Sequence, residues 1–191
     1  MELDEAMLAR AQEGDRTAQT AFLRRYAGPL RSLVRRLGGA ADIEDQLQEL
    51  FLTLLQALPR FVPEGRARLT TWVFAVAHRQ LIAGRRKARL TLVPLEECAA
   101  VPDAGPALDV LLGNKRLGVA LEEALAKLPP AHRRVFVLTQ LHQQPMESVA
   151  EVEGVPLGTI KSRLHRARAE LVLLLGPALD VPEGGRHAAS K

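Results

Sequence analysis

The chain has 191 residues, a formal net charge of +4 and one cysteine, Cys98. This length allows one large domain or two small ones, and a single cysteine excludes an intrachain disulfide framework and a cysteine-based zinc cluster. The sequence has neither the run of roughly 20 apolar residues that a membrane span needs nor the charged-then-apolar order of a signal peptide. We therefore expect a cytoplasmic protein with no direct insertion into a membrane.

The charge is unevenly distributed along the chain. Residues 1–90 carry a net charge of +5, residues 91–114 a net charge of −4, and residues 115–175 a net charge of +3. Two basic blocks that flank an acidic strip suit a polyanion contacted at two places. Two well-solvated surfaces would have the same charges, so both interpretations stay open at this point.

Helical spacing of apolar residues dominates the first ninety positions, and strand signals are scarce. Glycine and proline at Gly38, Gly39, Pro59 and Pro63 divide this block. The predicted helices are Asp4–Gln12, Arg16–Leu37, Asp42–Leu58 and Thr70–Lys87.

The remainder of the chain predicts a linker and a second helical block. The acidic, proline-containing stretch 91–114 is typical of a flexible linker. About four helices should follow, from near Lys115 to near Leu175, with a frayed tail beyond. The fold class is therefore all-α, with two small helical domains at 1–90 and 115–175, the acidic flexible linker at 91–114 and a flexible tail at 176–191.

The segment GVPLGTIKSRLHRAR, Gly154–Arg168, indicates a helix-turn-helix. Gly154 suits the C-cap of a helix over Glu147–Glu153, Pro156 prevents its continuation, and a new helix can begin near Thr159. At 100° per residue, one face of that helix is apolar and the opposite face is polar, basic and small. Such a face fits a DNA groove, although a helical hairpin with solvated bases is the alternative. The apolar face consists of Ile160, Leu164, Ala167 and Leu171.

The predicted helix Thr70–Lys87 has an apolar side and a side that combines a tryptophan with bases. An aromatic ring beside arginines can stack on an unpaired base next to phosphates, whereas a lone tryptophan is more often a core residue. The inward residues are Val73, Phe74, Ala77 and Leu81. The outward residues are Trp72, Ala75, Arg79 and Arg86, with His78 and Arg85 beside them.

The predicted helix Asp42–Leu58 has an acidic outer face that contains a leucine, Leu52. An acidic face does not suit phosphate, so it indicates either a protein-docking surface or an ordinary solvated face. The inward stripe is Ile43, Leu47, Leu50, Phe51, Leu54 and Leu58, and the polar outer residues are Asp45, Gln48, Glu49 and Gln56.

These segments resemble the ECF sigma factors of bacterial RNA polymerase, in the sigma-70 superfamily. Ala41–Phe51 and Ala57–Phe61, followed by Trp72, resemble their domain 2, and Leu128–Phe136 and Gly154–Arg168 resemble their domain 4. The likeness extends over roughly residues 1–175 in the family's order. It implies a promoter-specificity subunit whose partners are core RNA polymerase, through the β′ coiled coil and the β flap, promoter DNA and an anti-sigma factor.

The resemblance also implies site residues. Those implied to read the minus-35 element are Thr159, Lys161, Ser162, Arg163, His165 and Arg166. Those implied to melt and read the minus-10 element are Arg60, Phe61, Trp72, Ala75, His78, Arg79, Arg85 and Arg86. Those implied to dock on core polymerase are Asp42, Asp45, Gln48, Glu49 and Leu52.

Four features depart from the family pattern: Arg79, Ala83, Glu153 and the entry Gln143–Pro145. The family's minus-10 preference is therefore not carried over to this chain. A stand-alone helix-turn-helix regulator is the alternative function. An enzyme is not expected, because no catalytic residues, no metal ligands and no cofactor site can be picked out.

Overall fold

A computed structural model of the chain describes residues 4–38, 42–62, 68–91 and 115–179, and every regular element in these ranges is helical. The all-α prediction is confirmed. The predicted linker, apart from Thr91, and residues 180–191 of the predicted tail lie outside the described residues. In this described part, no helix is long and apolar enough to cross a membrane.

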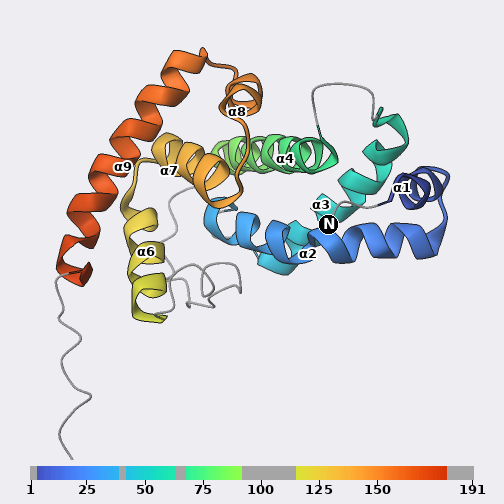
Figure 1. Ribbon diagram of the computed structural model, residues 1–191, viewed down its shortest axis with the longest axis horizontal. Helices are drawn as coiled ribbons and strands as arrows, with labels where there is room; N and C mark the ends of the chain where they lie inside the picture. Colours follow the sequence, from blue (N-terminus) through green and yellow to red (C-terminus); the bar gives the residue numbers. More distant parts are fainter. Residues whose placement is uncertain (1–3, 39–41, 63–67, 92–114, 180–191) are drawn as a thin grey trace, which may run out of the picture.

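Residues 4–91, here called the N-terminal block, contain four α-helices in their described part (Figure 1). The first three begin directly after an aspartate, because a carboxylate can accept the free N–H groups of the first turn. Asp15 Oδ1 accepts the N–H of Thr17 at 2.8 Å, and Asp42 Oδ1 accepts that of Glu44 at 2.7 Å. The helices are α1 (Glu5–Gln12), α2 (Arg16–Leu37), α3 (Ile43–Ala57), which a 3-10 turn (Leu58–Arg60) follows, and α4 (Leu69–Thr91).

The predicted inward faces of these helices form the core of the N-terminal block. Leu47, Leu50, Leu54 and Leu58 are buried, while Ile43 and Phe51 pack against them half-buried. On α4 the inward residues Val73, Phe74, Ala77 and Leu81 are likewise buried. The 3.6-residue period read from the sequence therefore gives the correct side of both helices.

Residues 115–179, here called the C-terminal block, contain four α-helices and a π-helical turn. The long helix α9 packs along α6 and α7, and α8 crosses its N-terminal end. Helix α9 continues to Leu179, four residues beyond the predicted end of the second block at Leu175. The elements are α6 (Lys115–Lys127), α7 (Pro130–Phe136), the π turn η2 (Val137–Leu141), α8 (Met146–Glu153) and α9 (Leu157–Leu179).

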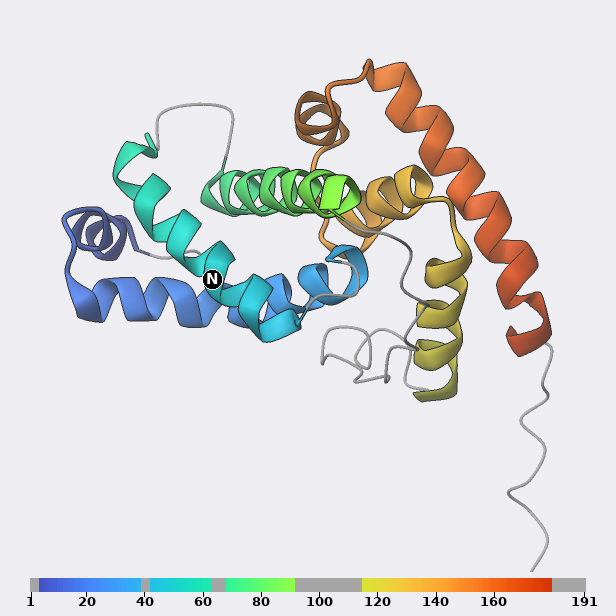
Figure 2. The same cartoon turned by 180° about the vertical axis from the view of Figure 1, so that it is seen from behind.

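The two blocks are in direct contact. Helix α4 packs against α2 and α3 of its own block and against α8 of the other, and α2 also contacts α6. Figures 1 and 2 show α4 at the centre of the molecule, with α8 beside it in both views. The α4–α8 and α2–α6 contacts are together called the joint below.

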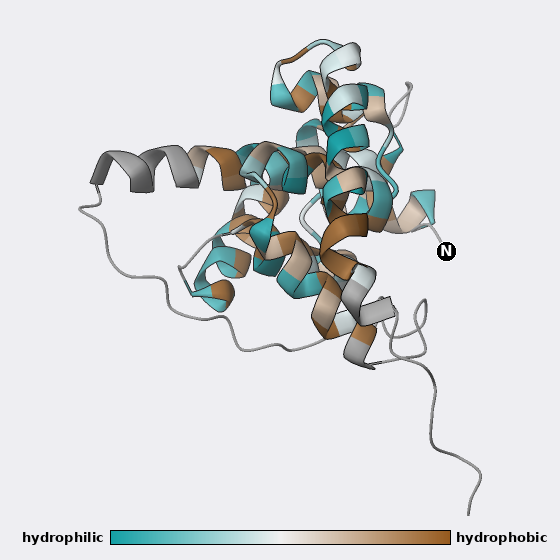
Figure 3. Ribbon diagram, turned by 90° about the vertical axis from the view of Figure 1, so that its left-hand side faces the viewer, coloured by the Kyte–Doolittle hydropathy of each residue, from teal (hydrophilic) through white to brown (hydrophobic). Residues whose placement is uncertain are grey.

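One apolar stretch is left uncovered near the end of α9. Figure 3 colours the part of α9 before its grey end as largely hydrophobic, and Val172, Leu173 and Leu174 are exposed in this part. Contiguous exposed apolar residues are typical of a surface that meets a protein partner.

Two leucines of α3 give a matched test of the predicted core. Leu54 is fully buried, whereas the side chain of Leu52 is 61% exposed on the same helix. We expect Leu54→Ala to lower the free energy of unfolding by about 2–5 kcal/mol, because a cavity replaces a packed side chain. Leu52→Ala should change it by less than about 0.5 kcal/mol. Urea denaturation of both variants measures the difference, and equal losses would contradict the assigned orientation of α3.

Candidate nucleic-acid interface

The turn between α8 and α9 has the geometry that its glycine predicts. Gly154 lies in the left-handed region (φ 65°, ψ 35°), and its N–H bonds back to carbonyls of the last turn of α8. An added Cβ at Gly154 would meet no atom within 4 Å, so the requirement for glycine is conformational and not steric. Helix α9 begins at Leu157, which places Thr159 in the first turn and not at the N-cap.

The outward face of α9 is open. Lys161, Ser162, His165 and Arg166 are exposed on it. On the opposite side Ile160, Leu164, Ala167 and Leu171 are buried, as predicted. The structure therefore presents four of the six predicted minus-35 residues on one exposed and positively charged surface.

Two of the predicted minus-35 residues are placed differently. Thr159 is half-buried, and its carbonyl accepts a bond from the Ser162 hydroxyl at 3.0 Å. Arg163 is turned toward α8, where its Nη1 lies 3.3 Å from Glu153 Oε2. Arg163 is therefore engaged within the protein and orients the start of α9 relative to α8.

Glu153 is the centre of a cluster of basic side chains from three helices. Its own side chain is only 3% exposed. Arg134 of α7 binds both carboxylate oxygens, at 2.7 and 2.9 Å, and Arg163 of α9 binds one of them. From the N-terminal block, His78 Nε2 lies 3.0 Å from Glu153 Oε1. Glu153 departs from the family pattern, in which this position is usually apolar. The departure has a physical reason, because the carboxylate is a charged acceptor for these basic side chains.

The cluster keeps the Glu153 carboxylate ionised. Burial by itself would raise the pKa of this carboxyl. Hydrogen bonds and charge interactions with Arg134 and His78 outweigh burial and lower the pKa to about 2. A bidentate arginine is the partner that best compensates a buried carboxylate.

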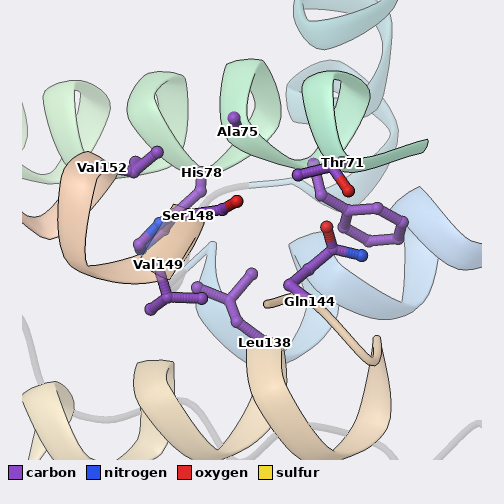
Figure 4. A pocket seen from close by; sticks show the side chains of 9 residues that line it. Thr71, Ala75, His78, Leu138, Gln144, Ser148, Val149 and Val152 are labelled. Carbon is purple, nitrogen blue, oxygen red and sulfur yellow. The ribbon is translucent and has the colours of Figure 1, made fainter. Parts of the chain in front are cut away.

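The side of α4 that was predicted to face DNA is partly covered by α8. His78 is 1% exposed, which corrects its predicted place on an outward face. Thr71 and Ala75 line a small cavity with Ser148 and Val149 of α8 and other residues of both blocks (Figure 4). Arg79 is exposed at the edge of this contact, with its Nη2 3.7 Å from Glu151 Oε1. The periodicity of α4 identified this face, but it held no information about the helix that packs on it.

The aromatic residues of the predicted minus-10 site pack on each other. Phe61 is buried, and its ring centroid lies 5.1 Å from that of the half-buried Trp72. Phe61 is therefore part of the core and not an open stacking surface, which corrects the prediction for it. Arg60 is exposed beside it, whereas the side chains of Arg85 and Arg86 lie outside the described residues.

The predicted docking face of α3 is open to solvent. Asp45, Gln48 and Glu49 are exposed around Leu52. Asp42 is also exposed, but its carboxylate caps the helix. The geometry of this face agrees with the sequence prediction, and its function as a docking surface stays a prediction.

The entry to α8 carries a feature that the sequence did not reveal. The π turn Val137–Leu141 is followed by Gln143 at φ 51°, an uncommon conformation for a residue other than glycine. This turn places the His142 ring next to the ring of Phe74 on α4, with 4.7 Å between the two ring centroids. Burial, together with the positive charge of Arg36, lowers the pKa of His142 to about 3.

Comparisons with known proteins place both blocks in one family. Residues 22–91 match the family Sigma-70 region 2, and residues 118–171 match the family Sigma-70, region 4. The ECF RNA polymerase sigma factor SigE of Mycolicibacterium smegmatis is 32% identical over 166 residues, which cover 83% of the chain and 63% of that relative. The chain belongs to the ECF group of the sigma-70 family.

A second relative and two solved structures agree with this assignment. The ECF RNA polymerase sigma-E factor of Escherichia coli K12 is 27% identical over 174 residues, 86% of the chain and 90% of that relative. CnrH in complex with the cytosolic domain of CnrY has a TM-score of 0.63 at 23% identity, over 92% of this chain and 99% of CnrH. The sigma factor RpoE of Bartonella quintana, in complex with the anti-sigma factor NepR, has a TM-score of 0.64 at 24% identity, over 82% and 96%. These structures show a shared fold.

In this sigma factor the joint therefore connects region 2 to region 4. The region 2 match contains all of α3 and α4, and the region 4 match contains α7, α8 and the first part of α9. His142 and Glu153 belong to region 4, and Phe74 and His78 belong to region 2. The contacts of His142 with Phe74 and of Glu153 with His78, which sequence reasoning missed, lie between the two regions.

The pKa of His142 predicts a dependence of stability on pH. Its folded pKa of about 3 lies below the ordinary 6.5, so the unfolded chain binds a proton in this range that the folded chain does not. The free energy of unfolding should fall as the pH is lowered from 6.5 toward 3, with a slope from this group of at most about 1.4 kcal/mol per pH unit. Urea denaturation at pH 7, 6 and 5 measures this slope before the ordinary pKa of 4.5 for Glu153 is reached.

His142→Gln supplies the control for this slope, because glutamine does not titrate. The variant should lose most of the pH dependence between 7 and 5. Identical slopes in the two proteins would contradict a neutral, buried His142.

Proposed function

We propose that this chain is the specificity subunit of RNA polymerase that positions core enzyme on a promoter through two DNA contacts. The observation that carries the proposal is the open basic face of α9 over a buried apolar stripe, within the region 4 match. A recognition helix of this kind can place side chains against base edges in the major groove. The stand-alone regulator would leave the region 2 match without a role.

The upstream contact is assigned to α9. Arg166 can donate two bonds to a guanine edge, Lys161 can neutralise a phosphate, and Ser162 and His165 can donate to or accept from bases. All four are exposed. Arg163, engaged by Glu153, would serve mainly to hold α9 at the correct angle to α8. In the family's scheme, the DNA segment that this face of α9 would contact is the minus-35 element.

The downstream contact is assigned to α4 and the turn before it. Arg60 and Arg79 are exposed cations, and the partly accessible Trp72 ring lies between them in sequence. Arg85, Arg86, Ala75 and His78 complete the predicted minus-10 surface. Because His78 is buried and Ala75 lines the cavity between α4 and α8, binding at that surface requires the two blocks to separate.

Two protein-docking surfaces complete the proposal. The acidic face of α3 suits the β′ coiled coil of core polymerase, since it would repel nucleic acid. The exposed Val172, Leu173 and Leu174 support a second protein contact in the C-terminal block, where the family meets the β flap. The proposal keeps the two domains at 1–90 and 115–175 and the acidic linker at 91–114.

A protein partner for this chain is proposed from two structures that share its fold. Two solved structures of the same fold are complexes, one with an anti-sigma factor and one with a cytosolic domain of CnrY, and a protein inhibitor of that kind is proposed for this chain. The role is non-enzymatic, and the proposed compartment is the cytoplasm.

The α3 face can be tested by reversing one charge. Asp45→Arg should weaken association with core polymerase at least tenfold, or about 1.4 kcal/mol, because a repulsive charge replaces a complementary one. Glu13→Arg is the matched control, an equally exposed acid on the loop after α1 with the same charge change. Titration of core polymerase with labelled protein measures both variants. An unchanged affinity of Asp45→Arg, with native circular dichroism, would count against the docking face.

The α9 face can be tested with DNA of two kinds. His165→Ala and Arg166→Ala should each cost about 1–3 kcal/mol on a promoter fragment recovered by the holoenzyme, and much less on the same fragment with a scrambled upstream element. Arg168→Ala is the control, because Arg168 lies on the flank of the helix and bonds to Gln140 Oε1 at 2.7 Å. Equal losses on both DNAs would assign the two residues to phosphate contacts alone.

A further inference from the structure

The 3-10 turn Leu58–Arg60 is held by one side chain of α1. Gln12 Nε2 donates to the carbonyl of Leu58 at 3.0 Å and to the carbonyl of Phe61 at 2.6 Å. Figure 1 shows α1 beside the end of α3, where this turn lies. A single amide group therefore binds the carbonyl at the start of the turn and the carbonyl directly after it.

The turn needs such a donor because its own backbone supplies few. The last carbonyls of a helix have no partner within the helix, and Pro59 and Pro63 remove two N–H groups from this segment. Leu58 and Phe61 are both buried. Water can therefore replace the amide of Gln12 as a donor only if the turn moves outward.

The amide of Gln12 is itself fixed in place. Helix α1 packs against α2, and Ala11, next to Gln12, is fully buried in this contact. Gln19 Nε2 of α2 donates to the carbonyl of Ala11 at 3.2 Å, and Arg10 forms an ion pair of 2.6 Å with Asp15. The position of α1, and with it that of the amide, is thus determined by α2.

The turn carries side chains of the proposed downstream DNA contact. Arg60 is exposed on it, and the ring of Phe61, directly after it, lies 5.1 Å from the ring of Trp72 between centroids. The start of α4 is fixed separately, because the hydroxyls of Tyr26 and Thr70 lie 3.2 Å apart. Helix α1 therefore holds one side of the ring contact, and α2 holds the other.

We infer that Gln12 is a positioning residue for the proposed downstream DNA contact: by fixing the 3-10 turn, it holds Arg60 outward and keeps the Phe61 ring against Trp72. The inference rests on the proposed function, because it needs DNA bound at this surface. Gln12 is half-buried and acts through the turn, not by contact with DNA. It also lies outside the region 2 match, which begins at residue 22. Helix α1 is thereby added to the elements that determine minus-10 recognition.

The fluorescence of Trp72, the only tryptophan of the chain, can test the contact with the turn. Gln12→Met removes the N–H donors with little change in side-chain length. Gln19→Met is the matched control, because the Gln19 amide bonds to α1 away from the turn. We expect acrylamide to quench Trp72 roughly twofold more strongly in Gln12→Met than in the control, because its half-buried ring loses the cover of Phe61. Equal quenching in the two variants would overturn the inference.

Promoter binding tests the function of the same contact. Core polymerase is combined with each variant and titrated with a promoter fragment recovered by the wild-type holoenzyme, and with the same fragment carrying a scrambled downstream element. Gln12→Met should lower the preference for the intact fragment roughly tenfold, whereas Gln19→Met should leave it unchanged. Stronger quenching of Trp72 with an unchanged preference would show a purely structural role and would also overturn the inference.

The wild-type protein separates this inference from the proposed function. If its holoenzyme binds both fragments equally well, the downstream contact is contradicted and the inference fails with it. If the wild type prefers the intact fragment and Gln12→Met prefers it as strongly, the proposed function stands and the positioning role is contradicted. A second pair, Gln12→Glu and Gln19→Glu, repeats both measurements with a side chain of the same shape that has no N–H group to donate.

Discussion

The carboxylate of Glu153 is the interaction on which the arrangement of this protein depends. It is nearly inaccessible to solvent, and it is bound by Arg134 from α7 and Arg163 from α9, with His78 from α4 next to it. An isolated buried carboxylate would be very costly, so it requires such partners. One side chain thereby fixes the angle between the two helices of the helix-turn-helix and also connects region 4 to region 2.

The contact between the two blocks affects which of the proposed DNA-binding surfaces is accessible. A sigma factor that contacts a promoter at two points needs two surfaces held at a spacing set by DNA and polymerase. In this structure, however, the two blocks pack on each other, His78 is buried, and Ala75 lines a small cavity between α4 and α8. The upstream face of α9 stays exposed in the same arrangement. The two proposed DNA-binding surfaces are therefore not equally accessible, and the proposed downstream surface is the one that depends on a change of arrangement.

Local structure was predictable from the sequence because its causes are local. Glycine and proline breaks, Gly154 at the turn and the 3.6-residue period identified the helices and their buried faces, and α2 has the predicted bounds. The same period gave the open residues of α9. The positions of Phe61 and His78 were wrong because each is decided by a partner far away in sequence: Trp72 for one and α8 for the other. Similarly, no pattern in Gln140–Pro145 reveals that the chain turns His142 onto Phe74.

The departure at Glu153 shows where such signals can be found. The sequence marked Glu153 as a departure from the family pattern, and the bases that meet it were already present in the predicted helices. What the sequence could not provide was their convergence on one carboxylate from three helices. Buried charges at unexpected positions are therefore useful starting points in a search for contacts between domains.

The central claim is that this chain confers promoter specificity on core polymerase. In vitro transcription with core polymerase, the purified chain and a genomic DNA template tests it most directly. We expect discrete start sites that appear only when the chain is added and are lost when the face of α9 is altered by Arg166→Ala. The absence of any start site that depends on the chain, together with failure of the chain to co-purify with core polymerase, would contradict it.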